Sequence, residues 1–268
     1  MSVEKQRALT LSLTEWVFAG NRFANYLWLL PLGLGFLVWE AVTRLGLVAS
    51  SNLPTFSSVL IVFIASMQSS SFLLKIMHSF LNLVFGLFLA FAVALPLAFT
   101  AGSKNKFDLT FTPIIMLFGA LPELSFLPLL VLWFGPGNVA AIIMASLAGF
   151  FPIYFTVREG TRSIPRELFD VTAIFKSNRL STFTKMVLPA ISPQMFSGLR
   201  LAYDFAWEII IAIEIATRMS GIGDFIDGNV ASGSLQNGFA AIFAIAIVAI
   251  VVDRAFFGSL EAWTKRWA

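Results

Sequence analysis

The sequence predicts an all-α membrane protein with about six transmembrane helices. Of its 268 residues, 58% are hydrophobic and only 12% are charged, and the mean hydropathy is +0.84. Soluble domains are about 25% charged, so this chain has too little polar surface to cover a soluble globule. The length favours one membrane domain without a second, soluble domain.

Six apolar runs are long enough to cross a bilayer core, which takes about 20 residues of helix. They cover residues 27–47, 76–101, 109–133, 139–157, 197–216 and 239–257. Pro122 and Pro128 interrupt the third run. Because proline removes helical hydrogen bonds, we expect a broken helix there, with its freed backbone groups buried in protein or lining a wet cavity.

Lysine and arginine fix the expected orientation, since cytoplasmic loops carry an excess of them. Most of the 18 basic residues fall in the N-terminal segment, the 158–194 connection and the C-terminal tail, whereas Arg44, Lys75 and Arg218 fall on the other side. We therefore expect both termini inside. The predicted division is a cytoplasmic segment at 1–26, a transmembrane domain at 27–258 with the 158–194 loop inside, and a cytoplasmic tail at 259–268.

The 158–194 connection predicts two short amphipathic helices. Ser163 can cap the first helix, with Pro165 in its first turn, and Leu168, Val171 and Phe175 then share one face. A second apolar face consists of Leu180, Phe183, Met186 and Val187 and is expected to end at Pro189. Lipid headgroups, the inner ends of the spans or another protein could cover these faces.

This connection resembles the cytoplasmic signature loop of ABC importer permeases. Asp170-Val171-Thr172 stands at the family's Glu-Ala-Ala position, Lys176 at its Gly position, and Leu188-Pro189 at its Leu-Pro position with the family's spacing. The small Ala pair and the Gly are thus replaced in this chain.

The resemblance extends over residues 30–258 and is strongest to permeases for taurine, aliphatic sulfonates, nitrate and bicarbonate. The similar segments are Leu121-Pro122 with Leu127-Pro128, Trp133-Phe134-Gly135-Pro136-Gly137, Ser197-Gly198-Leu199-Arg200 with Trp207 and Glu214, and Gly221-Ile222-Gly223.

The resemblance implies the type I ABC importer permease fold in a bacterial inner membrane. It implies a homodimer bound to two cytoplasmic ATPase subunits, an extracytoplasmic solute-binding protein and membrane lipid, with no nucleic-acid partner. ATP and Mg²⁺ would be held by the partner ATPase, and this chain would bind no cofactor. The residues implied in ATPase coupling are Leu168, Asp170, Val171, Thr172, Phe175, Lys176, Leu188 and Pro189.

The sequence argues against an enzyme. It has no cysteine, one histidine and no G-x-x-x-x-G-K phosphate loop. We therefore expect no catalytic residues and no metal site.

Charged residues inside a span are costly and are functional candidates by default. Arg200, Asp204 and Glu208 are spaced by four and share a helix face next to Trp207. The expected translocation path consists of Glu123, Arg200, Asp204, Trp207, Glu208 and Glu214. Two alternatives stay open: Arg200 and Asp204 can form a structural ion pair, and Glu214, on another side of the helix, can serve packing or gating.

The acids also bear on the solute, which the resemblance suggests is a sulfonate such as taurine, nitrate or bicarbonate. Desolvated carboxylates repel anions, so a neutral or cationic solute such as a vitamin precursor is a further possibility. A secondary transporter or channel is the alternative function, but it predicts inverted repeats and leaves the paired cytoplasmic helices unexplained.

Overall fold

The computed structural model of the protein describes residues 29–175 and 178–260. Throughout these ranges the regular elements are helices, and no strand occurs among them. The chain divides into two compact units, Met1–Ile61 and Val62–Ala268. The predicted all-α architecture is confirmed for the described residues.

In the first unit, Glu40 joins helix α2 (Leu29–Arg44) to the first turn of α3 (Phe56–Ser66). One carboxylate oxygen accepts hydrogen bonds from Arg44 Nε at 2.6 Å and Ser57 Oγ at 2.8 Å, and the other accepts from the Ser57 N–H at 3.0 Å. A carboxylate beside free N–H groups at a helix start is favourable. Glu40 is therefore a structural acid of the α2–α3 corner.

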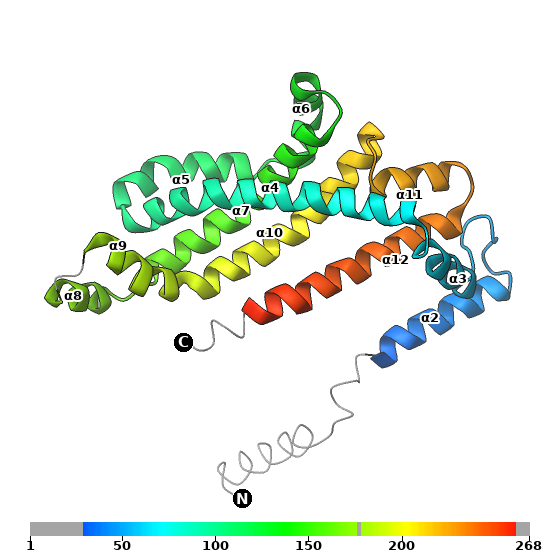
Figure 1. The fold of residues 1–268 in the computed structure, drawn as a ribbon, viewed down its shortest axis with the longest axis horizontal. Coiled ribbons are helices and arrows are strands. Elements are labelled where there is room, and N and C mark those ends of the chain that lie inside the picture. The colour runs from blue at the N-terminus through cyan, green and yellow to red at the C-terminus, as the bar shows by residue number, and fades with distance from the viewer. Residues whose placement is uncertain (1–28, 176–177, 261–268) are drawn as a thin grey trace, which may run out of the picture. The chain divides into compact units, whose positions relative to one another are not determined.

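The second unit is built on three long helices that lie side by side (Figure 1): α4 (Ser70–Ser103), α7 (Asn138–Arg162) and α10 (Leu188–Thr217). Small residues let membrane helices approach closely. A Cβ on Gly198 of α10 would lie 1.9 Å from Thr156 Oγ1 of α7, so this crossing requires glycine. Further small residues buried between the helices are Ala90, Ala94, Ala98, Ala141, Ala145 and Ala148.

The third apolar run is a broken helix, as its prolines predicted. Helix α5 (Asn105–Gly119) is followed by the 3₁₀ turn Glu123–Phe126 and by α6 (Leu127–Phe134). The two halves are bent by 85° relative to each other. Proline cannot continue the ladder of helical hydrogen bonds, and Pro122 stands immediately before the 3₁₀ turn.

The 158–194 connection contains α8 (Arg166–Ile174), α9 (Arg179–Thr182) and the π-helical turn Phe183–Val187, which leads directly into α10. The expectation that a helix ends at Pro189 is wrong. Pro189 lies in the first turn of α10, directly after the π-helical turn, so the helical path continues through it. The residues predicted to form one apolar face before Pro189 do not share one environment, since Val187 is buried while Leu180 is 72% exposed.

The role predicted for Ser163 is also corrected. It stands at the C-terminal end of α7, where its N–H donates to the Glu159 carbonyl and its hydroxyl donates to the Gly160 carbonyl at 2.9 Å. Because its hydroxyl is used by the preceding helix, Ser163 does not cap α8, which begins at Arg166.

The last elements are α11 (Ile222–Ala231), α12 (Leu235–Val252) and the π-helical turn Asp253–Phe257. In Figure 1, α8 and α9 lie at one end of the α7 and α10 bundle and α11 lies at the other. Helix α10 runs between these two ends and so connects them.

Of the six predicted spans, three described helices meet the length and hydropathy of a membrane crossing: α4, α7, and α12 with its extension to Leu260. The bent pair α5 and α6 makes a fourth. Helix α10 has 30 residues, but charged side chains interrupt its apolar sequence. Helix α2 has 16 described residues, fewer than a membrane crossing takes. The number six therefore remains an expectation from the sequence.

Candidate translocation path and coupling helices

Helix α8 presents the predicted apolar residues to its surroundings. Leu168, Val171 and Phe175 are 40%, 47% and 77% exposed, and Ile174, which is not among the residues predicted for this face, is 77% exposed. Asp170 is exposed as well. Lys176 lies outside the described residues. The helix therefore offers an uncovered apolar surface at the end of the bundle.

An ion-pair network fixes the end of α7 from which α8 projects. Asp108 on α5 accepts hydrogen bonds from Arg158 Nε at 2.5 Å and Arg158 Nη2 at 2.7 Å, and it also pairs with Arg162. Its Oδ1 accepts from Thr112 Oγ1 at 2.6 Å, and the Tyr154 hydroxyl lies 2.7 Å from the same Thr112 oxygen. The carboxylate is buried and fully paired, so the network joins α5 rigidly to α7.

One face of α10 carries the exposed charges. Arg200, Asp204 and Glu208 are all exposed, as their spacing by four predicted. Trp207 and Glu214 lie on the buried side of the same helix, with 5% and 0% of their surface exposed. The predicted path residues of α10 therefore fall into two groups: an exposed charged face and two buried residues.

Arg200 pairs with Asp253 rather than with Asp204. Its Nε lies 2.6 Å from Asp253 Oδ1, and its Nη2 donates to Asp253 Oδ2 at 2.8 Å. The alternative of an Arg200–Asp204 ion pair is thus corrected. On a helix, a base four residues before an acid is the less favourable order, and the π-helical turn after α12 supplies a bidentate partner.

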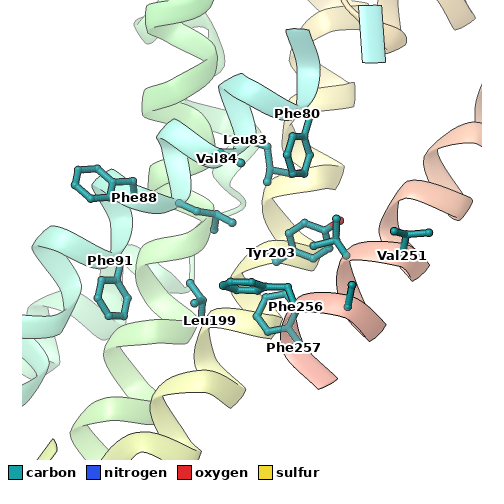
Figure 2. A pocket seen from close by; sticks show the side chains of 13 residues that line it. Phe80, Leu83, Val84, Phe88, Phe91, Leu199, Tyr203, Val251, Phe256 and Phe257 are labelled. Carbon is teal, nitrogen blue, oxygen red and sulfur yellow. The ribbon is translucent and has the colours of Figure 1, made fainter. Parts of the chain in front are cut away.

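An apolar cavity of about 500 Å³ lies beside the charged face. Figure 2 shows that its side chains come from α4, α10 and the end of α12, with Phe80, Leu199, Tyr203 and Phe256 among them. Leu199 and Tyr203 directly precede Arg200 and Asp204 in the chain. Neighbouring positions of helix α10 therefore line the apolar cavity and carry the exposed charges.

Glu123 is half-buried and begins the 3₁₀ turn at the break of the third span. The structure gives it no ion pair with another described residue. Over residues 29–175 and 178–260 there is no group of three acids or histidines that could hold a metal ion.

Known proteins match this chain over most of its length. SsuC of Bacillus subtilis, named as an aliphatic sulfonates transport permease, is 27% identical over 230 residues, covering 86% of this chain and 83% of its own. The taurine transport system permease TauC of Escherichia coli is 26% identical, covering 84% and 85%. The nitrate import permease NrtB of Leptolyngbya laminosa is 32% identical, covering 53% and 50%.

The family model that matches the chain covers residues 83–266, which include the broken span, the 158–194 connection and the charged face of α10. This is well over half of the sequence. The chain belongs to the family of binding-protein-dependent transport system inner membrane components.

Proposed function

We propose that the chain is the membrane-spanning permease subunit of an ATP-driven ABC importer. It works as a homodimer with two cytoplasmic ATPase subunits, which hold ATP and Mg²⁺, and an extracytoplasmic solute-binding protein delivers the solute. The observation that supports this proposal most strongly is the uncovered apolar surface of α8 in a chain of this family. Exposed apolar patches of this kind mark interaction sites.

The coupling surface consists of the residues predicted from the loop pattern. Leu168, Val171 and Phe175 supply apolar contact area, Asp170 supplies a charge on the same short helix, and Thr172 bonds locally to the Phe169 carbonyl at 2.8 Å. Lys176, Leu188 and Pro189 complete the set.

Two of the proposed coupling residues lie on the path helix itself. Leu188 and Pro189 are half-buried at the start of α10, and the π-helical turn before them continues into α10 without a break. Because a helix transmits displacement along its axis, closure of the ATPase subunits would move α10 and its charged face as one body.

The solute path follows the exposed face of α10, with Glu123 at the broken span. Asp204 and Glu208 face outward, whereas Arg200 is neutralised by Asp253. The relatives are named for sulfonate, taurine, nitrate and bicarbonate. Two acids that form no ion pair among the described residues disfavour an anion, so neutral or cationic compounds, including vitamin precursors, belong beside those anions as solutes to screen.

Co-purification with the ATPase tests the coupling surface. The partner is identified by its G-x-x-x-x-G-K phosphate loop, and the test variant is Val171→Asp. Val230→Asp is a matched control, because Val230 on α11 is 48% exposed and Val171 is 47% exposed. We expect Val171→Asp to weaken assembly by about tenfold or more and Val230→Asp to leave it unchanged. Equal assembly in both variants would refute this docking surface.

A further inference from the structure

Glu214 is a carboxylate buried completely near the end of α10, with 0% of its surface exposed. A buried charge is expensive unless it is paired or hydrogen-bonded. No ion pair to Glu214 occurs within the described ranges, so neighbouring hydrogen-bond donors must compensate for its burial.

Those donors come from two other helices. Ser79 Oγ of α4 donates to Glu214 Oε1 at 2.7 Å, and the Gly223 N–H of α11 donates to Oε2 at 2.8 Å. The Ile222 N–H donates to Ser79 Oγ at 2.9 Å. The first two N–H groups of α11, which no helical carbonyl can satisfy, are thus bound by Glu214 directly or through Ser79.

The chain around Glu214 is shaped to this contact. A Cβ added to Gly221 would lie 2.1 Å from the Glu214 carboxyl group, so a side chain at 221 would displace the carboxylate. Two further contacts join the same helices: Lys75 Nζ lies 2.8 Å from Asp224 Oδ2, and the Phe72 and Phe225 rings meet edge to face with centroids 5.0 Å apart. The Lys75–Asp224 and Phe72–Phe225 contacts hold α11 against α4, and the close approach of Gly221 to Glu214 holds its start against α10.

We propose that Glu214 is a positioning residue that holds the start of α11 on α4 through its two hydrogen bonds, and that it does not contact the solute. Helix α12 begins four residues after α11 ends, and Asp253, the partner of Arg200, follows its last residue. The short connection therefore links the position of α11 to the start of α12, the helix that leads to Asp253. The proposal does not depend on which solute or ATPase the chain serves.

Two substitutions separate hydrogen bonding from charge. In Glu214→Gln, the amide oxygen can accept from the Gly223 N–H and the amide N–H can donate to Ser79 Oγ. The Ser79 hydrogen is then free to bond the Lys75 carbonyl, 3.1 Å away. Glu214→Met has a similar shape but no acceptor, so it leaves the buried donors unsatisfied. A role through charge predicts equal damage from both, whereas a positioning role predicts damage from Met alone.

Thiol labelling measures the opening of α11 without any solute. The full chain has no cysteine, so Ile222→Cys introduces a single thiol at a position that is 0% exposed. Its rate of reaction with N-ethylmaleimide in membranes reports local opening. We expect Glu214→Met to raise this rate by about tenfold or more and Glu214→Gln by less than about threefold. Glu208→Met, at an exposed acid of the same helix, is the control and leaves the rate unchanged.

Either of two results would overturn the proposal: Glu214→Met labelling at the parent rate, or Glu214→Gln opening α11 as much as Glu214→Met. If Glu214→Met does not accumulate in membranes, Ser79→Ala takes its place, since it removes the donor to Oε1 and the acceptor of the Ile222 N–H. Its labelling rate is expected to rise by about tenfold, and an unchanged rate would overturn the proposal equally.

Discussion

The Asp108 carboxylate on α5 accepts two hydrogen bonds from the Arg158 guanidinium on α7, at 2.5 and 2.7 Å. Arg162, one turn further along α7, pairs with the same carboxylate. Helix α8 begins four residues after Arg162. The ion pair therefore fixes the end of α7, which directly precedes the proposed coupling helix α8.

Asp108→Asn should destabilise the chain, because it leaves Arg158 largely buried without its anion. Breaking a buried pair costs roughly 3–5 kcal/mol, and we expect the lower end because Arg158 keeps 19% side-chain exposure. The free energy of unfolding in detergent by denaturant measures it. Glu159→Gln is the control, since Glu159 is 74% exposed and 3.9 Å from Arg158. Equal stability of the two variants would contradict the network.

We expect the coupling energy between Arg200 and Asp253 to be larger than that between Arg200 and Asp204. Double-mutant cycles to alanine should give about 0.5–1 kcal/mol for Arg200 with Asp253, since both side chains are partly exposed. The same cycle for Arg200 with Asp204 should give a smaller value. A larger coupling energy with Asp204 would show that Arg200 changes its partner in the membrane.

Local pattern predicted the helices well, because each signal lies within the element it describes. The apolar runs located α4, α7 and α12, and Pro122 located the break between α5 and α6. Spacing by four placed Arg200, Asp204 and Glu208 on one exposed face. The exposed stripe of α8 also followed from the spacing of its apolar residues.

Partners distant in sequence could not be predicted, since they depend on how the helices pack. Asp108 and Arg158 are 50 residues apart, and Arg200 and Asp253 are 53 apart. Acids within spans are usually functional, which leaves a path, packing or gating role open for Glu214, and its hydrogen-bond donors on α4 and α11 have no local sequence signal. A signal was available in Gly221, because glycine near a buried acid suggests close approach.

Glu208→Gln should leave folding unchanged, because Glu208 is exposed and the structure shows no ion pair for it within the described ranges. If the residue lines the path, the substitution should lower solute-stimulated ATP hydrolysis by the reconstituted complex. Glu208→Asp, which keeps the charge, should retain more of the stimulation. Parent-like stimulation in Glu208→Gln would remove this residue from the proposed path.

The proposed orientation predicts that the 158–194 connection and the loop near Ser51 lie on opposite sides of the membrane. Single cysteines introduced by Thr184→Cys and Ser51→Cys test this, since both positions are exposed and the parent has no cysteine. An impermeant thiol reagent added to intact cells should label the cysteine at 51 and spare the one at 184. Labelling of the cysteine at 184 from outside would reverse the topology.

The energy source of uptake separates an ABC importer from a secondary transporter or channel. Proteoliposomes carrying this chain, the ATPase and the binding protein can be screened with taurine, an alkanesulfonate, nitrate, bicarbonate and neutral or cationic heterocycles. We predict that one solute raises ATP hydrolysis and accumulates only when ATP is supplied to the ATPase side. Accumulation by this chain alone, driven by an ion gradient without ATP, would show that the chain is a secondary transporter and not an ABC importer permease.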